Sequence, residues 1–203
     1  MIGPLIIAGV LIEDTKIDQL RELGVRDSKV LSPRRRDFLQ ARIKIIVRGF
    51  HLVEIQPAQI DEVVLSGRRL RRLNFLEAQA MADVITKLQP DVAYVDSSDV
   101  LADRFGQDIS SMLPAGIRVV SEHHADSRYP VVAAASILGK VRRDAIIREL
   151  AQRYGDLGSG YPSDPKTIRF LEGWYDSHGS FPDFVRKSWK TLERISNRRQ
   201  RKL

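Results

Sequence analysis

The stretch that decides the fold is Val92-Ala93-Tyr94-Val95-Asp96, a short apolar run that follows the helix breaker Pro90 and ends in an acid. β-Branched and aromatic residues in a run of this length predict a buried strand. A helical pattern precedes the run at residues 75–88, and another follows it at 102–113. A strand placed between two helices is the repeating unit of an α/β protein.

The same alternation continues outward to both ends of the chain. We expect strands over 5–12, 50–55 and 117–121, and helices over 34–47, 57–66, 130–155, 163–177 and 184–195. The continuous apolarity of 5–12 indicates a strand covered on both faces, and Ser32 with Pro33 forms a helix start signal. The fold class is therefore α/β, a sheet flanked by helices with a C-terminal helical extension. We expect a sheet domain over 1–155, a helical region over 156–195 and a disordered basic tail over 196–203.

The composition describes a basic chain without cysteine. Its 203 residues are 43% hydrophobic, which allows a sizeable core, and the formal net charge is +7. A basic balance favours a polyanionic partner such as nucleic acid. The absence of cysteine excludes disulfides, zinc–thiolate sites and cysteine nucleophiles. No apolar run approaches the ~20 residues that span a bilayer, so we expect a cytoplasmic protein.

Two acids follow predicted strands and are candidate metal ligands. Asp96 ends one strand, where open α/β sheets place their ligand and metal sites. Asp126 comes shortly before Pro130, where a helix N-terminus favours the ionised carboxylate that a hard metal needs. Each acid has a plainer alternative, because Asp often caps a turn or starts a helix. His123 and His124 would point to opposite faces of a strand, so we expect structural or surface groups rather than a zinc site.

A glycine-rich loop and several basic side chains are candidates for nucleic-acid binding. The loop is Gly158-Ser159-Gly160-Tyr161-Pro162, in which small residues let the backbone approach a ligand and Tyr161 could stack on a sugar or base. A tyrosine that only covers the core is the alternative. Candidate phosphate contacts are the basic residues Lys29, Arg34, Arg35, Arg36, Arg186, Lys187 and Lys190. Such clusters also occur as solvated faces of amphipathic helices.

Five ordered motifs carry a resemblance to a known family. They are the segments 27–33, 94–97, 122–144, 158–165 and 186–191, and the match runs from residue 1 to about residue 195. In this order and at these separations they resemble ribonuclease HII (type 2 ribonuclease H), especially its archaeal form. The resemblance implies a ribonuclease H-like mixed sheet flanked by helices.

The function that the resemblance implies is that of an endonuclease. It would hydrolyse the RNA strand of RNA/DNA hybrids and nick duplex DNA at embedded ribonucleotides, a step in DNA repair, leaving 5′-phosphate and 3′-hydroxyl ends. The family uses four carboxylates and two divalent ions, Mg²⁺ or Mn²⁺, and its third and fourth acids fall on Asp96 and Asp126. Its ribonucleotide-sensing tyrosine falls on Tyr161. The resemblance also implies nucleic-acid contacts at Gly160, Lys29, Lys140, Arg186 and Lys187, a monomer, and a sliding clamp as a candidate partner.

One part of the family pattern is not found in this sequence. Family members begin with a strand that holds an Asp-Glu pair and then a Gly-Arg-Gly loop, and only then comes the strand that here occupies 5–12. That first strand is central in the resembling fold, between the strand at 5–12 and the strand that ends at Asp96. The first acids here, Glu13 and Asp14, would lie roughly 30 Å from the site. We therefore expect a misassigned start or a fragment, which the codons upstream of Met1 would test.

Three functions stay open on the sequence alone. The leading one is the endonuclease, although the activity of this chain is left open because half of the expected acids are lost. The second is a non-catalytic binder of RNA/DNA hybrids that keeps Tyr161 and the basic surfaces. The third is an unrelated basic α/β protein that binds ribosomal RNA.

Overall fold

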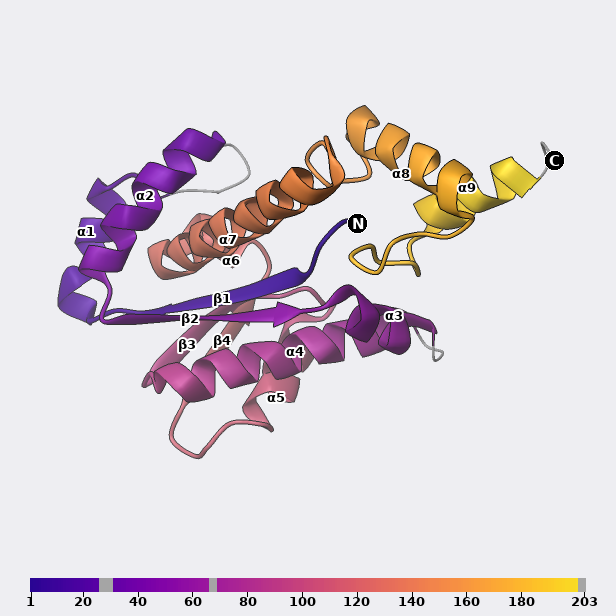
Figure 1. Ribbon diagram of the computed structural model, residues 1–203. Coiled ribbons are helices and arrows are strands. Elements are labelled where there is room, and N and C mark those ends of the chain that lie inside the picture. Colours follow the sequence, from indigo (N-terminus) through magenta and orange to yellow (C-terminus); the bar gives the residue numbers. More distant parts are fainter. Residues whose placement is uncertain (26–30, 66–68, 201–203) are drawn as a thin grey trace. The chain divides into compact units, whose positions relative to one another are not determined.

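A computed structural model describes residues 1–25, 31–65 and 69–200, so Lys29 lies outside the described residues. The strands are β1 (Leu5–Leu11), β2 (Gly49–Ile55), β3 (Val92–Asp96) and β4 (Arg118–Glu122). The helices are η1 (Asp14–Lys16), α1 (Ile17–Glu22), α2 (Pro33–Ile46), α3 (Pro57–Leu65), α4 (Arg69–Leu88), α5 (Ala102–Ser110), α6 (Ala125–Arg128), α7 (Pro130–Tyr154), α8 (Pro165–His178) and α9 (Lys190–Gln200) (Figure 1). The predicted α/β class is confirmed.

Most elements form where the sequence predicts them. β3 covers the predicted residues, and Ser32 caps α2 by accepting a hydrogen bond of 3.3 Å from the N–H of Arg35. α8 begins at Pro165 as expected, but its cap is Asp164 and not Ser163, because the Asp164 carboxylate accepts a hydrogen bond of 2.9 Å from the N–H of Lys166. The short helices α1 and α6 are additions to the prediction.

The predicted start of the last helix is wrong, since α9 begins at Lys190 and not at 184. Val185 instead forms an antiparallel bridge with Ile2, and the N–H of Arg186 donates a hydrogen bond of 3.0 Å to the carbonyl of Met1. Backbone groups that pair with a distant segment cannot also close helical turns. α9 also continues to Gln200, past the predicted end at 195.

The chain divides into two compact units, each built from separate segments. The sheet unit comprises Ile6–Glu54 and Leu70–Arg142, and the helical unit comprises Met1–Leu5, Ile55–Arg69 and Arg143–Leu203. In the sheet unit β3 and β4 pair in parallel, and Asp96 lies opposite Glu122 in that ladder. β1 pairs with β2 to form a second two-stranded sheet. The predicted boundaries at 155 and 195 stay predictions.

Helices cover both faces of β1 within the sheet unit, with α4 on one side and α7 on the other (Figure 1). A Cβ atom at Gly9 would lie 2.4 Å from Cγ1 of Val84 on α4, and one at Gly139 on α7 would lie 3.3 Å from Cβ of Ala8. A larger residue at Gly9 would therefore collide with α4. This two-sided cover agrees with the continuous apolar run of β1.

Each unit has its own apolar core. In the sheet unit one cluster joins β1, α2 and α7, with Val10, Leu39, Ile43, Ile137 and Leu138, and another joins β3 to α4 and α5, with Ala93, Val95, Phe105 and Ile109. The core of the helical unit is built from Ile2, Leu157, Leu171, Val185 and Leu192. No helix in the described part of the chain is long and apolar enough to cross a membrane.

Candidate active site

Asp96 is held at the end of β3 by contacts with β4 and with the segment that follows β4. The N–H of Ser97 donates a hydrogen bond of 2.9 Å to the carbonyl of Glu122, which continues the parallel pairing past Asp96. The Oδ1 atom of Asp96 accepts a hydrogen bond of 3.0 Å from the N–H of Ala125. The half-buried carboxylate of Asp96 therefore lies at the carboxyl end of a strand, as predicted.

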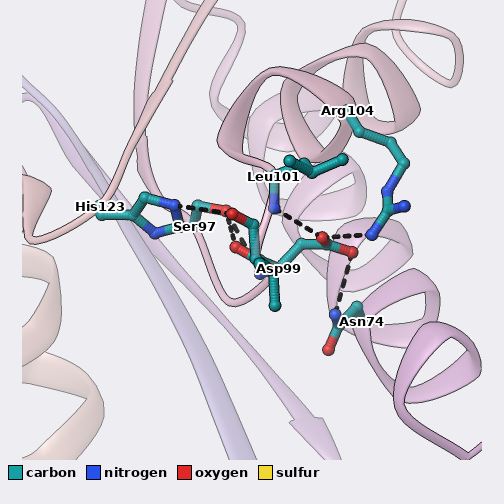
Figure 2. A network of polar contacts seen from close by, with 7 residues as sticks. Asn74, Ser97, Asp99, Leu101, Arg104 and His123 are labelled. Carbon is teal, nitrogen blue, oxygen red and sulfur yellow. Dashed lines mark hydrogen bonds and ion pairs between the residues drawn. The ribbon is translucent and has the colours of Figure 1, made fainter.

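A polar network around Asp99 fixes the loop that leaves β3 (Figure 2). The buried Asp99 carboxylate accepts hydrogen bonds from the N–H of Leu101 at 2.9 Å and from Asn74 at 3.0 Å, and it pairs with Arg104. The hydroxyl of Ser97 bonds to both the N–H and the carbonyl of Asp99. Burial opposes ionisation, but these donors outweigh it and lower the pKa of Asp99. An ionised Asp99 thus holds the loop next to Asp96.

Asp126 lies on α6, a single helical turn between β4 and α7. Its side chain is only 6% exposed. Among the described residues, its hydrogen-bond donor is the hydroxyl of Ser127 at the long distance of 3.5 Å. A buried carboxylate needs a positive partner or several donors, and the described protein atoms provide neither. The turn itself was missed from the sequence, which placed Asp126 in the loop before the long helix.

Asp96 and Asp126 line the same groove in the sheet unit. The groove has a volume of about 370 Å³ and lies between β1 and β3, with α4 and α7 as its other walls. Its lining is largely apolar and includes Ile6, Ala8, Met81, Val95, Val132 and Ala135. Within the described residues β1 pairs with β2 and β3 with β4, so the groove separates two small sheets. Two acids in the lining of an apolar groove suit a hard cation that is partly shielded from water.

Glu77 is a further acid in the lining of the groove, but in the part of the chain that the structure describes it forms no metal-binding cluster with Asp96 and Asp126. No group of three or more His, Cys, Asp or Glu residues is placed there to hold an ion. The expectation that His123 and His124 are surface groups fits their exposure. The reason differs, however, because β4 ends at Glu122 and the histidines follow it. Nε2 of His123 lies 3.3 Å from the carbonyl of Val100, and His124 has a left-handed φ of 57°.

Tyr161 and Gly160 form a separate feature in the helical unit. Tyr161 is 43% exposed, and the guanidinium of Arg143 lies 3.8 Å from its ring centroid. Gly160 has a φ of +75°, and its N–H donates a hydrogen bond of 2.9 Å to the hydroxyl of Thr167. The sequence did not point to Arg143, whose position under the ring depends on α7. Tyr161, one of the two predicted contact residues, is therefore an exposed aromatic ring that packs on a cation, and Gly160 is the residue before it.

The basic residues predicted to contact phosphates differ in their surroundings. Arg186 is only 9% exposed; its Nε donates to the carbonyl of Gly3 at 3.1 Å, and its guanidinium lies over the ring of Trp189. Lys187 pairs with Asp183 at 2.9 Å. Lys140 is half-buried on α7. Their contacts with nucleic acid stay predictions, as does that of Lys29.

Solved structures define the class of protein to which this fold belongs. Ribonuclease H2 from Pyrococcus horikoshii superimposes with a TM-score of 0.88 at 40% identity, over 98% of this chain and 92% of that chain. Ribonuclease HII from Archaeoglobus fulgidus, in a complex with PCNA, gives a TM-score of 0.84 at 42% identity, over 96% of this chain and 90% of that one. The fold is therefore that of a type 2 ribonuclease H.

Comparison of sequences leads to the family. The model of the ribonuclease HII family matches residues 1–192. Ribonuclease HII of Thermococcus sibiricus is 44% identical over 99% of this chain and 88% of its own length, and that of Methanosarcina barkeri is 45% identical over 96% and 89%. The chain belongs to the ribonuclease HII family, which comprises hydrolases that act on RNA/DNA hybrids.

Proposed function

We propose that this chain is an endonuclease that hydrolyses the RNA strand of RNA/DNA hybrids and nicks duplex DNA at embedded ribonucleotides, leaving 5′-phosphate and 3′-hydroxyl ends. The observation that carries the proposal is the pair Asp96 and Asp126, which line one groove. Membership of the ribonuclease HII family supports the choice of substrate. The basic net charge of +7 suits a polyanionic duplex.

The two carboxylates fit a hard divalent cation. Divalent-metal dependence is a property of the ribonuclease H family, and carboxylate oxygens are the ligands that Mg²⁺ and Mn²⁺ prefer. Oδ1 of Asp96 is engaged by Ala125, so Oδ2 is the oxygen left for a cation. We propose that Asp96 and Asp126 hold part of a two-ion site for Mg²⁺ or Mn²⁺. When bound, such ions activate water and neutralise the charge that develops on the phosphate.

The residues of the chain would then position the substrate and the ions. The hydrogen bond from Ala125 to Asp96 keeps the α6 turn at the end of β3, so the two acids stay at one end of the groove. The network around Asp99 holds the loop after Asp96 in a single arrangement. A fixed ligand geometry lowers the reorganisation that the site must undergo during the reaction.

We further propose that Tyr161 senses the ribonucleotide. An exposed ring can stack on a sugar or base, and the buried Gly160, whose N–H bonds to Thr167, holds the loop that carries this ring. Arg143 under the ring restricts its movement and adds positive charge near the phosphates. Distinguishing RNA from DNA requires contact with the 2′-hydroxyl.

A non-catalytic binder of RNA/DNA hybrids is the second candidate. It is favoured by one observation, namely that no cluster of three or more acids or histidines is placed to hold an ion among the described residues. A nicking assay with Mn²⁺ on duplex DNA that contains one ribonucleotide separates the two functions. Cleavage that Asp96→Asn abolishes supports the endonuclease, whereas tight binding of the same duplex without cleavage supports the binder. Plain DNA duplex is the control substrate.

Partner and location complete the proposal. The Archaeoglobus fulgidus relative was solved in a complex with PCNA, and we propose that a sliding clamp of this kind also binds the present chain. We propose a monomer that works in the cytoplasm. Sedimentation of the purified chain with and without a clamp protein tests both the monomer and the clamp contact.

A further inference from the structure

In the sequence Glu122 lies between Asp96 and Asp126, the two candidate metal ligands, and it contacts the segments that carry them. It is the last residue of β4 and the ladder partner of Asp96. Its carbonyl accepts the hydrogen bond of 2.9 Å from Ser97, the residue after Asp96. The backbone of Glu122 therefore fixes the end of β3.

The side chain of Glu122 reaches in the other direction, to the end of the α6 turn that carries Asp126. Its Oε1 accepts a hydrogen bond of 2.9 Å from the hydroxyl of Tyr129, and its Oε2 pairs with Arg128. The hydrogen bond to Glu122 raises the pKa of Tyr129, so the phenol keeps the proton that it donates. The Arg128 side chain is 65% exposed, so solvent screens that pair and the bond to Tyr129 is the stronger tie.

The ring of Tyr129 closes the connection back to β3. It packs on the ring of Tyr94 with a centroid distance of 4.4 Å, and Tyr94 lies two residues before Asp96 on the same strand. A chain of contacts thus runs from β3 through Tyr94 and Tyr129 to Glu122 and returns to β3 through the ladder. The α6 turn is fastened at Ala125 by Asp96 and at its far end by Glu122.

We infer that Glu122 is a positioning residue that fixes Asp126 relative to Asp96. Both of its carboxylate oxygens contact protein donors, Tyr129 and Arg128, so the side chain holds the turn. The inference deepens the proposed function and rests on it for the metal, but the arrangement of the turn can be measured without metal. Mutation of a residue that only orients the ligands commonly lowers metal affinity by roughly 10- to 100-fold.

Three single variants of the full chain, and the double variant of the first two, test the inference. Tyr129→Phe keeps the ring on Tyr94 and removes the hydroxyl, and Glu122→Ala removes both acceptor oxygens. Glu54→Ala is the matched control, because it breaks the Arg142–Glu54 pair of 2.6 Å in the same unit, and Glu54 is 31% exposed against 29% for Glu122. Circular dichroism of each variant verifies the fold.

The first measurement is hydrogen exchange of the Ala125 amide in metal-free protein, because this amide bonds to Asp96. We expect exchange roughly tenfold faster or more in Glu122→Ala and Tyr129→Phe, with the double variant of these two no faster than the faster single variant, and no change in Glu54→Ala. The second measurement is Mn²⁺ affinity by electron paramagnetic resonance, which should fall by roughly 10-fold or more in the same two variants.

Unchanged exchange of the Ala125 amide in Glu122→Ala overturns the inference, and so does an equal acceleration in Glu54→Ala. A wild-type chain that binds no Mn²⁺, or binds it equally well after Asp126→Asn, contradicts the proposed function instead. In that case the exchange rates still decide whether Glu122 positions the turn. The two failures are therefore separate results.

Discussion

The N–H of Ala125 donates a hydrogen bond of 3.0 Å to Oδ1 of Asp96, so one candidate ligand holds the turn that carries the other. Asp96 comes from a strand and Asp126 from the single helical turn α6, and 29 residues separate Ala125 from Asp96 along the chain. This bond joins the two segments at the end of the groove. Changes to either acid therefore affect both the geometry and the charge of the site.

Asp126→Asn should stabilise the metal-free protein. The wild-type carboxylate is buried, with a hydrogen bond of only 3.5 Å from Ser127 among the described residues, and removal of such a charge should raise the free energy of unfolding by about 1 kcal/mol. The same variant should lose the rise in melting temperature that Mn²⁺ gives the wild type. Urea unfolding and melting curves measure both effects. Asp83→Asn, at an exposed acid on α4, is the control for the loss of one charge. A lower free energy of unfolding in Asp126→Asn would argue against an uncompensated charge on Asp126.

Asp96→Asn and Asp96→Ala should separate the two roles of Asp96. The amide oxygen of Asn can still accept the hydrogen bond from Ala125, whereas Ala cannot. We expect both variants to lose cleavage of a hybrid, and only Asp96→Ala to lose about 1 kcal/mol of unfolding free energy. Cleavage assays and urea unfolding check the two results. Cleavage retained in Asp96→Asn would mean that the charge of Asp96 is not needed.

Asp99 should make the stability of the chain depend on acid pH. Burial alone would raise the pKa of Asp99 in the folded state, but the donors Leu101, Asn74 and Arg104 outweigh burial and lower the pKa. Its contribution is therefore complete above the unfolded pKa of about 3.9 and is lost as the pH falls through the folded pKa. Asp99→Asn should cost about 1–3 kcal/mol at pH 7, and the gap to wild type should shrink below about pH 4. Urea unfolding at several pH values measures it.

The control for Asp99 is Asp91→Asn, at an exposed acid before β3. Its unfolding free energy should follow that of the wild type at every pH. A gap between wild type and Asp99→Asn that stays constant from neutral to strongly acid pH would show that the charge of Asp99 is not what holds the loop.

Gly160→Ala should destabilise the helical unit more than Gly155→Ala. Both glycines have positive φ angles, +75° and +88°, but a Cβ at Gly160 would lie 2.9 Å from Cδ1 of Ile147 and 3.0 Å from Nη2 of Arg143, whereas one at Gly155 meets nothing within 4 Å. The angle alone costs about 1 kcal/mol at either position, and at Gly160 the ends of the Ile147 and Arg143 side chains must also move, which adds ~1 kcal/mol. Thermal and urea unfolding compare the two variants. Equal losses would show that Gly160 is there for its φ angle only.

Tyr161→Ala should reduce discrimination more than binding. Loss of a stacked ring typically weakens binding at that base by ~1–3 kcal/mol, so we expect the preference for a ribonucleotide-containing duplex over plain DNA to fall by about tenfold. Tyr161→Phe keeps the ring over Arg143 and isolates the hydroxyl. Equilibrium binding to both duplexes measures the ratio. An equal loss on both would contradict a sensing role.

The sequence predicted those parts of the fold that depend on local signals. The apolar run from Val92 to Asp96 formed β3, and Ser32 with Pro33 started α2, because a β-branched run and a capping hydroxyl act within a few residues. Residues 184–189 do not form the predicted helix, because Val185 pairs with Ile2 and Arg186 bonds to Met1, at the other end of the chain. Local propensity carries no information about such pairing.

The sequence predicted the acids of the candidate site, but it did not predict the residues that hold those acids in place. Asp96 and Asp126 stand after strands, and that position is visible in a sequence. The roles of Asp99 and Glu122 depend on partners from Asn74 to Tyr129 that only the folded chain brings together. Charge alone also did not predict which basic residues are exposed, since Arg186 is buried and donates to the carbonyl of Gly3.

The most direct measurement is the rate of RNA-strand cleavage in an RNA/DNA hybrid as the Mn²⁺ concentration is raised, for wild type, Asp96→Asn and Asp126→Asn. We expect wild-type cleavage that rises with Mn²⁺ and saturates, that stops when a chelator is added, and that is slower by about 100-fold or more in either variant. Cleavage that persists in Asp126→Asn, or that proceeds in the presence of the chelator, would contradict the assignment of Asp96 and Asp126 as the acids that hold the metal.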